Sequence, residues 1–562
     1  MPSRIHIINR IWQALLLAAI MATALLVLSR PLAQTNLLPS TEIEHTEQAR
    51  EIASLFSREQ SARLSRLGVD IETVRRFYER RRYEPTWTKS IKGKSSAAAA
   101  ISALVHGEED GLATLSARQA ELLKQAESGD APLYDVLLTD AVLRYVRELR
   151  VGRLTPAAVY RDALLPTQLF DPVEALQAAF SQGNFSRLFV DAAPLHQEYQ
   201  RLKAALATYR RIAAEGGWPQ IARGGRASID PGDARIPALL VRLAREQAPL
   251  PGDIVEALRD YQARNGLEPD GKLGPETIEM LNISASERVE QIIANLERWR
   301  WLPRILETRF VMVNAADATL QVIDNGRVVL RSRVIVGTSR TPTPIFRAEA
   351  TEVTVNPVWN VPPSIAVNEI LPKLQRDPNY LVSQHMVLLN GPSGDPHGTR
   401  IDWQHVSAKA FPYRIQQAPG KDNALGALKL EMPNLFNVYL HDTPAKSAFQ
   451  SSRRTLSHGC VRVQEILPLA SIALEGNAVS AVARLTGSVL SGENRRLPII
   501  EPLPVYIVYW TAIADADGVL QFRRDVYGRD KVLMSALAAT KHPLDIVLEG
   551  CATTEMRRAP VN

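Results

Sequence analysis

The chain contains 562 residues, which is too long for one ordinary domain and predicts two to four. Hydrophobic residues make up 46% of it and charged residues 22%, which excludes a disordered chain, a collagen-like fibre and a polytopic membrane protein. The formal net charge of +6 is spread along the chain without a dense Lys/Arg run, so it fits a polyanionic surface and argues against a nucleic-acid partner.

The N-terminus has the pattern of an export segment. Arg4 and Arg10 precede an uncharged, mostly apolar run over residues 11–28, and Ala33 follows as a candidate cleavage residue. This run is long for a signal peptide and just long enough to span a bilayer. Residues 1–33 are therefore predicted to be a signal peptide, which is favoured, or a retained membrane anchor. Both place the rest of the chain outside the cytoplasm.

The next part of the chain changes from polar to helical texture. Residues 34–60 are polar and are predicted to form a linker. Helical periodicity follows over residues 61–235, where Leu138, Val142 and Tyr145 lie on one helical face. We expect a helical domain here, closed by a glycine-rich junction.

A compact helical unit is predicted over residues 240–285. Ile254, Leu258 and Tyr261 share one helical face, and Pro275 stands in the first turn of a second helix. The unit contains neither a catalytic dyad nor a set of metal ligands, so its predicted role is binding.

The sequence period changes to that of strands at residue 310. The signal Asn325-Gly326 lies between two alternating runs and is typical of a tight hairpin. The predicted strands are 310–314, 319–323, 328–336, 353–355, 436–440 and 505–511.

The strongest chemical signal lies between residues 437 and 463. The strand pattern puts Tyr439 and His441 on one face, with His441 at the end of the strand. The run Ser457-His458-Gly459-Cys460-Val461-Arg462 follows, and a helical pattern comes after it.

These residue types suit nucleophilic catalysis by a thiol. A thiol reacts once it is deprotonated, and its pKa falls beside an imidazole, a cation or a helix N-terminus. His441, Arg462 and the following helix supply all three to Cys460, and backbone N–H groups near Gly459 could hold an oxyanion. The one other cysteine is Cys551, so a free working thiol is a serious prediction for an exported chain.

Two other interpretations of the motif stay open at this point. A cysteine is often a small buried hydrophobe, although the polar neighbours of Cys460 argue against an apolar site. His441, Asp442, His458 and Cys460 would also give a plausible zinc set, but their spacing matches no zinc pattern that we can name. We therefore predict no metal and no cofactor.

The motif resembles that of the L,D-transpeptidase catalytic domain of the YkuD type. The resemblance implies a mostly β fold in which Cys460 is the nucleophile and His441 the general base. It implies that Ser457, His458, Gly459 and Arg462 shape the substrate and oxyanion site. The family often has glycine after the base, where this chain has Asp442.

Further stretches resemble the large periplasmic branch of that family. They are residues 77–87, 138–156, 356–364 and 423–426, while 250–283 resembles a three-helix peptidoglycan-binding domain. The implied fold is multidomain α+β. Its parts would be a helical scaffold domain at 61–235, the peptidoglycan-binding domain at 240–285, a catalytic domain at 308–490 with a cap at 364–432, and a C-terminal segment at 491–562 that packs on the scaffold and catalytic domains. Trp359 and Tyr439 are candidate aromatics lining the substrate, with core packing as the alternative.

The resemblance implies a periplasmic acyltransferase that crosslinks peptidoglycan and serves cell-wall biogenesis and cell shape. Cys460 would attack the third-residue carbonyl of a tetrapeptide stem, release the terminal D-Ala and pass the acyl group to a stem amine. Carbapenems would acylate Cys460, wall synthases are expected partners, and a retained anchor would add the inner membrane. A carboxypeptidase or wall hydrolase on the same fold, or a non-catalytic wall-binding scaffold, remains an alternative.

Overall fold

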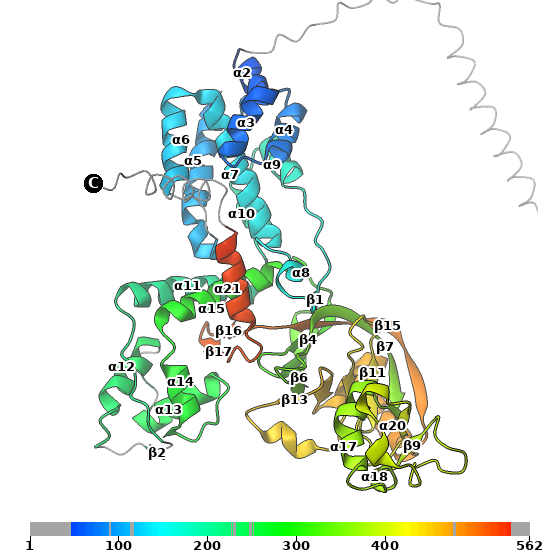
Figure 1. Ribbon diagram of the computed structural model, residues 1–562. Coiled ribbons are helices and arrows are strands. Elements are labelled where there is room, and N and C mark those ends of the chain that lie inside the picture. The colour runs from blue at the N-terminus through cyan, green and yellow to red at the C-terminus, as the bar shows by residue number, and fades with distance from the viewer. Residues whose placement is uncertain are drawn as a thin grey trace, which may run out of the picture.

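The computed structural model describes residues 47–88, 91–112, 117–225, 227–228, 232–246, 250, 252–475 and 479–540. The predicted export segment 1–33 and Cys551 lie outside these residues. Within the described ranges, no helix is both long and apolar enough to cross a membrane. The chain forms a multidomain α+β structure, with helices in its N-terminal half and a large sheet in its C-terminal half (Figure 1).

The N-terminal helices pack around the long helix α7 (Ala131–Val151) and share one hydrophobic core. The others are α2 (Glu47–Leu55), α3 (Arg58–Arg66), α4 (Ile71–Arg80), α5 (Ile91–Val105), η1 (His106–Asp110), α6 (Ala117–Gly129), α9 (Pro172–Gln182) and α10 (Arg187–Ala192). The predicted linker 34–60 is wrong from residue 47 onward, because α2 and the start of α3 occupy it. Ile52 and Leu55 of α2 are buried in this core, which explains why the segment is ordered as a helix.

A second group of helices forms a small module beside the sheet. We call α12 (Ile236–Glu246), α13 (Ile254–Arg264) and α14 (Pro275–Leu281) the binding unit. Short strands β2 (Ala227–Ser228) and β3 (Lys272–Leu273) pair beside it. Helix α11 (Gln197–Ala214) and helix α15 (Ala285–Arg300) pack against each other next to the unit.

Helix α15 is the link that the sequence reasoning missed, since residues 286–307 fell between two predicted domains. Its start is marked by a capping box, in which Ser284 and Glu287 bond each other's backbone N–H groups. Ser-x-x-Glu before an apolar run is a signal that could have found the helix.

The main sheet closes on itself. Its path runs β7, β11, β12, β14, β6, β5, β4 and β15, and β15 pairs both with β4 and with β7. These strands are β4 (Arg309–Asn314), β5 (Thr319–Asp324), β6 (Arg327–Gly337), β7 (Ile345–Val355), β11 (Leu428–Glu431), β12 (Leu440–His441), β14 (Val461–Val463) and β15 (Arg495–Val508). The predicted hairpin at Asn325-Gly326 is confirmed, because both residues have the positive φ that this tight turn requires.

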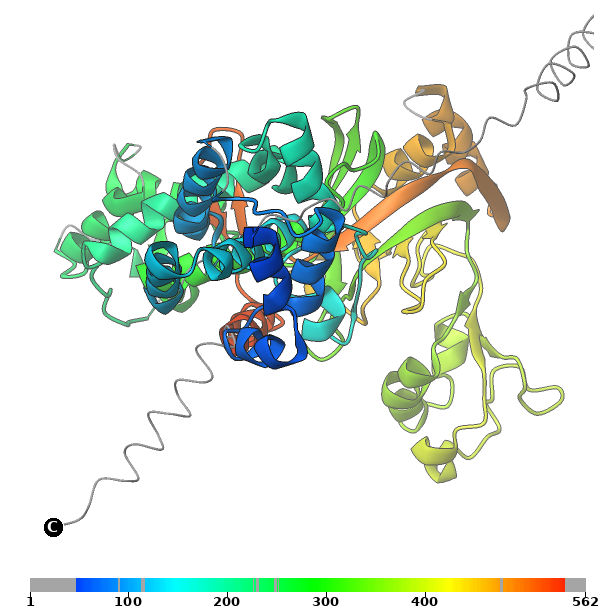
Figure 2. The same ribbon diagram turned by 90° about the horizontal axis from the view of Figure 1, so that it is seen from above.

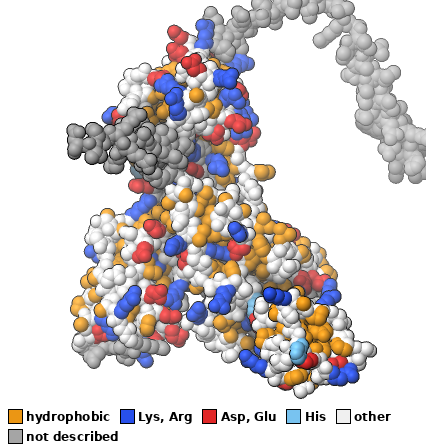
Figure 3. All heavy atoms as spheres, viewed as in Figure 1, with side chains coloured by type: hydrophobic (Ala, Val, Ile, Leu, Met, Phe, Trp, Pro, Cys, Tyr) orange, Lys and Arg blue, Asp and Glu red, His pale blue; other side chains and the backbone are white. Residues whose placement is uncertain are grey.

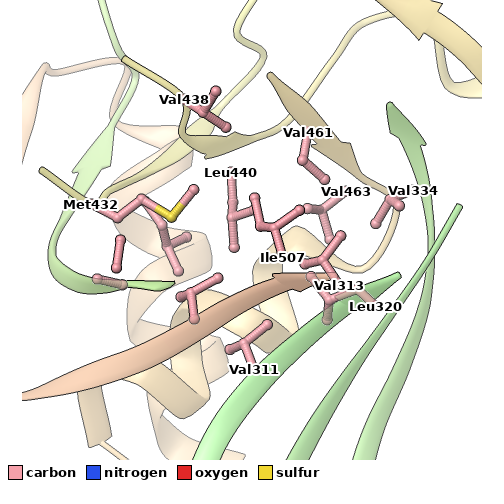
Figure 4. Packing of buried hydrophobic residues seen from close by; sticks show 14 of the residues in the cluster. Val311, Val313, Leu320, Val334, Met432, Val438, Leu440, Val461, Val463 and Ile507 are labelled. Carbon is pink, nitrogen blue, oxygen red and sulfur yellow. The ribbon is translucent and has the colours of Figure 1, made fainter. Parts of the chain in front are cut away.

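Strand alternation gives the sheet two cores. Val311 and Val313 of β4 point into the interior of the sheet, where they meet Ile507 of β15 (Figure 4). Phe310 and Met312 point the other way, into a cluster that we call the junction core. The junction core includes Tyr209, Leu258, Tyr261, Leu296, Trp299, Tyr506, Trp510 and Phe522, so it joins α11, the binding unit, α15, β15 and the chain that follows.

The C-terminal segment is built into these cores. It was predicted to pack on the scaffold and catalytic domains, but β15 is itself a strand of the sheet. After β15, the hairpin of β16 (Ala512–Ala514) and β17 (Leu520–Phe522) enters the junction core, and α21 (Arg529–Ala539) contacts α15.

The N-terminal half also contributes to the sheet. After α8 (Pro156–Val159), the short strand β1 (Ala163–Leu164) pairs in parallel with β7.

A cap stands apart from the sheet (Figure 2). We define it as residues 359–417, whose strands β8 (Trp359–Asn360), β9 (Met386–Leu388) and β10 (Ile415–Gln417) form their own sheet. Its helices are α16 (Pro363–Ile365), the π-helical η2 (Ala366–Ile370), α17 (Leu371–Leu374) and α18 (Tyr380–Ser383). The 3-10 turns η3 (Trp403–His405) and η4 (Ala408–Ala410) complete it. The predicted cap 364–432 extends too far, because β11 pairs with β7 and β12 in the main sheet.

Candidate active site

The register of β12 and β14 brings the predicted catalytic residues together. The two strands are parallel, with Leu440 opposite Val461 and His441 opposite Arg462. Side chains alternate along a strand, so Leu440 and Val461 enter the core while the positions on either side face away from it. His441 and Arg462 therefore share one face with the residues two places before them, Tyr439 and Cys460.

The predicted strand 436–440 is mostly wrong, because β12 contains only Leu440 and His441. Asn437 has a left-handed backbone with φ of 54°, which interrupts the extended chain. The Asn434 side chain holds this turn, since its Oδ1 accepts from the N–H groups of Phe436 and Val438. The turn brings the carbonyl oxygen of Asn437 within 3.8 Å of Cys460 Sγ.

Cys460 is half-buried, and burial raises the pKa of its thiol. Hydrogen bonding from Tyr439 and the positive charges of Lys429 and Arg462 lower the thiol pKa, but the effect of burial is larger. The predicted lowering of the thiol pKa is therefore wrong for the free protein. The helix predicted to assist, α19 (Ile466–Glu475), begins six residues after Cys460 and is followed by α20 (Val479–Leu490).

His441 is buried, and its imidazole is held neutral. Burial, followed by the positive charges of Arg462 and Lys429, lowers the pKa of His441 to about 3. Its ring lies 5.4 Å from the Tyr439 ring in an edge arrangement, and hydrogen bonding with the backbone of Asp442 and Leu425 opposes the lowering of its pKa. A neutral imidazole can accept a proton, which is what a general base must do.

Lys429 is a site residue that the sequence did not reveal. It lies opposite His441 in the pairing of β11 with β12, and its Nζ stands 4.0 Å from the centre of the Tyr439 ring. The same nitrogen pairs with Glu431 at 2.5 Å. Only the strand register places this cation beside the thiol and the imidazole, so no sequence motif could have found it.

The loop carrying the nucleophile is fixed by hydrogen bonds. We call residues 457–460 the motif loop. Ser457 Oγ donates to the Cys460 carbonyl at 2.6 Å and accepts from the Gly459 N–H at 3.1 Å. Gly459 has φ of 113°, which favours glycine, and its carbonyl accepts from Thr343 Oγ1 at 2.9 Å. Because the Gly459 N–H is already engaged, the Cys460 N–H is the better candidate donor to an oxyanion.

Asp442, the departure from the family pattern, has a structural role. Its carboxylate accepts from the Ala427 N–H at 3.0 Å and pairs with Lys446. It fills the space beside Gly426, where an added Cβ would lie 2.4 Å from the Asp442 side chain. Asp442 thus ties the chain leading into β11 to the end of β12, and the partners of its carboxylate are a backbone N–H and a lysine.

Among the described residues, a contact between a histidine and a carboxylate links the cap to the motif loop. His458 Nε2 contacts a carboxylate oxygen of Glu369, which lies on the π-helical turn η2 of the cap. The Glu369 charge also acts on Arg462 and raises the pKa of that guanidinium, although burial lowers it more. Sequence reasoning missed Glu369 because nothing local marks it, although π-helical turns are frequent at functional sites.

Trp359 is placed differently from the other predicted residues. It lies in β8 opposite Gln417 of β10 and packs, partly buried, against the core of the cap. This position favours the packing interpretation of Trp359. Tyr439, in contrast, stands between Lys429 and His441 on the face that carries Cys460.

Across the described ranges, no three His, Cys, Asp or Glu side chains gather as a metal site would require.

Comparisons with known proteins match three parts of the chain. Residues 308–480 match the model of the L,D-transpeptidase catalytic domain. Residues 252–281 match a "Putative peptidoglycan binding domain", and residues 72–206 match a Scaffold domain. Three separate parts of the chain are thus similar to an L,D-transpeptidase catalytic domain, a peptidoglycan-binding domain and a scaffold domain.

One curated relative is a "Putative L,D-transpeptidase" of Haemophilus influenzae, 36% identical over 246 residues. The match covers 44% of this chain and 49% of that protein, so the chain spans about half the length of this relative. Solved structures with similarity include an L,D-transpeptidase from Mycobacterium smegmatis, at 14% identity with a TM-score of 0.17, covering 36% of this chain and 58% of the other. The L,D-transpeptidase LdtMt1 in complex with imipenem matches at 16% identity with a TM-score of 0.17, covering 36% of this chain and 59% of the other.

Proposed function

We propose that the protein is a peptidoglycan L,D-transpeptidase that works through Cys460. The observation that carries this proposal is the register of β12 with β14, which sets Cys460, His441, Tyr439 and Arg462 on one face. A thiol nucleophile and a neutral base are the groups that acyl transfer through a thioester uses, and the nearby cations would stabilise the thiolate.

The first half of the reaction forms an acyl-enzyme. Cys460 Sγ attacks the carbonyl of the third residue of a donor tetrapeptide stem, a diaminopimelate, while His441 accepts the thiol proton. The resulting oxyanion takes a hydrogen bond from the Cys460 N–H. The C–N bond to the terminal D-Ala then breaks, and its amine leaves with the proton from His441.

The second half transfers the acyl group. The amine of a neighbouring stem attacks the thioester carbonyl, His441 accepts the amine proton, and the Cys460 thiolate leaves and is reprotonated. The product is a crosslink between two diaminopimelates. Water in place of the amine would release a tripeptide stem, which is the carboxypeptidase reaction.

The binding unit supports peptidoglycan as the substrate, because holding the enzyme on the polymer raises the local concentration of stems. We further propose that the enzyme works in the periplasm, exported by residues 1–33, since that is where its polymer lies. Wall synthases that lengthen the same strands are the proposed partners.

Product analysis tests the function. The full chain and a Cys460→Ala variant are incubated with soluble disaccharide-tetrapeptides, and the products are resolved by mass spectrometry. Dimers that have lost one D-Ala, formed by the full chain and absent with the variant, support the transpeptidase. Tripeptide monomers without dimers would assign water as the acceptor. Unchanged substrate with both proteins would contradict the proposal.

A further inference from the structure

A large cleft lies between the binding unit and the main sheet, outside the site described above. It encloses about 1330 Å³, more than the roughly 300–1,000 Å³ of sites for drug-sized ligands. One wall is formed by the ends of α13 and α14, and the other by the β4–β5 turn and residues 450–455. Parts of α15 and α21 also line it. Figure 3 shows the surface receding between the two lower lobes of the molecule.

Several charges in the cleft are paired with each other and hold its walls. Arg524 pairs with Glu276 at 3.0 Å and with Glu279, so it ties the C-terminal segment to α14. Arg523 pairs with Asp317 of the β4–β5 turn. These ion pairs cross between the elements that form the cleft, which makes it a preformed feature rather than a loose gap.

Other charges in the cleft have no partner among the described residues. The side chains of Arg453 and Lys531 are exposed cations, and those of Glu268 and Glu290 are exposed carboxylates. None of the four forms an ion pair or side-chain hydrogen bond with the described part of the chain. The cleft therefore offers free charges of both signs, together with the hydroxyl groups of Ser339 and Ser452.

The cleft also leads toward the nucleophile. Residues 450–455 run directly into β13 (Thr455–Ser457), which pairs with β6 and continues as the motif loop. Thr338 lines the cleft, and its N–H donates to the Ser457 carbonyl at 3.0 Å. A polymer in the cleft would thus lie beside the strand that leads into the motif loop and Cys460.

We propose that this cleft binds a peptidoglycan strand, meaning a glycan chain bearing zwitterionic peptide stems, and aligns it between the binding unit and the motif loop. The inference rests on the proposed function for its choice of polymer. Stem peptides carry carboxylates that suit Arg453 and Lys531 and amines that suit Glu268 and Glu290, while the sugars offer hydroxyl groups. The volume of the cleft suits a polymer segment better than a single small molecule.

Charge reversal in the cleft provides the test, with two double variants of the full chain. One is Arg453→Glu/Lys531→Glu, matched by Arg327→Glu/Lys94→Glu outside the cleft. The other is Glu268→Lys/Glu290→Lys, matched by Glu59→Lys/Glu501→Lys. All eight residues are exposed, so the variants should fold, and thermal unfolding checks this. Binding is measured by co-sedimentation with purified insoluble peptidoglycan, and chemistry by the turnover of soluble disaccharide-tetrapeptides.

Both cleft variants should bind the insoluble polymer about tenfold more weakly, while both controls bind as the unchanged chain does. The Glu268→Lys/Glu290→Lys variant is decisive, because a merely electrostatic attraction to an anionic wall would make it bind more tightly. Tighter binding, or unchanged binding of both cleft variants, overturns the inference. Soluble turnover by the two control variants should stay within about twofold of that by the unchanged chain. Absence of turnover in every protein would refute the proposed function while leaving the binding result readable.

Discussion

The binding unit and the cap are both small modules beside the main sheet, and they are attached to it in opposite ways. The unit has no core of its own, since Leu258 and Tyr261 lie in the junction core with residues of α15 and β15. There Trp299 stacks on Trp510 with ring centres 4.1 Å apart. The cap has a separate core around Trp403, and among the described residues the contact of His458 with Glu369 links it to the motif loop.

This difference indicates which module can move by itself. A module that shares buried apolar area with its neighbours opens only when they open, whereas a module with its own core can move or unfold locally. We therefore expect the binding unit to hold a constant position relative to Cys460 and the cap to admit substrate. The polymer would be anchored on the rigid side and enter on the mobile side.

Two matched tryptophan truncations test whether the binding unit and the cap open independently of the main sheet. Trp510→Ala and Trp403→Ala each remove a buried indole, which costs about 3–5 kcal/mol of local stability. In hydrogen exchange, Trp510→Ala should lose protection in the binding unit, α15 and the sheet together. Trp403→Ala should lose it within residues 359–417 alone. Loss of protection throughout the sheet in Trp403→Ala would show that the cap shares the main core after all.

Acid should also separate the two modules. The pKa of His441 is about 3 in the folded protein and about 6.5 when unfolded, so below about pH 6.5 the unfolded chain binds a proton that the folded chain does not. The stability of the sheet should therefore fall as the pH drops from about 6.5 toward 3, and the binding unit should unfold with it.

Denaturant unfolding from pH 7 to 4, compared between the full chain and His441→Gln, measures this contribution. The variant should show a shallower loss of stability with falling pH. Equal slopes in both proteins would mean that His441 titrates normally and is not held neutral by burial.

The smallest expected effect concerns the bridge between cap and motif loop. Glu369→Gln removes the charge that pairs with His458, and both side chains are largely exposed, so about 0.2–1 kcal/mol is at stake. Exchange in residues 363–374 should rise by up to about fivefold, with thermal unfolding unchanged. Glu493→Gln, which breaks an exposed pair with Arg495, is the control. If exchange in residues 363–374 rose as much in Glu493→Gln as in Glu369→Gln, the contact with His458 would not be what holds the cap in place.

Much of the site could be predicted because its chemistry is local in sequence. The motif loop and His441 are close along the chain, and the residue spacing of the binding unit predicted two of its helices, α13 and α14. The pair Asn325-Gly326 predicted the hairpin because these two residue types readily adopt the positive φ that the tight turn requires. These features depend on residue type over a few positions, which is what a sequence records.

The remaining features depend on contacts between distant segments. Lys429 enters the site through the pairing of β11 with β12, Thr343 through its bond to the Gly459 carbonyl, and Glu369 through the docking of the cap. The raised pKa of Cys460 is a consequence of burial, which no motif encodes. The closure of the sheet by β15 joins residues 345–355 to residues 495–508, and it turned a predicted peripheral segment into part of the core.

Trapping the acyl-enzyme identifies the residue that acts as the nucleophile. The full chain is incubated with a carbapenem and then examined by intact mass and peptide mapping, beside Cys460→Ala. Opening of the β-lactam by the Cys460 thiolate should add the whole mass of the drug, located on the peptide that contains the motif loop and absent from the variant. An unmodified protein, or an adduct on any other residue, would contradict the assignment of Cys460 as the nucleophile.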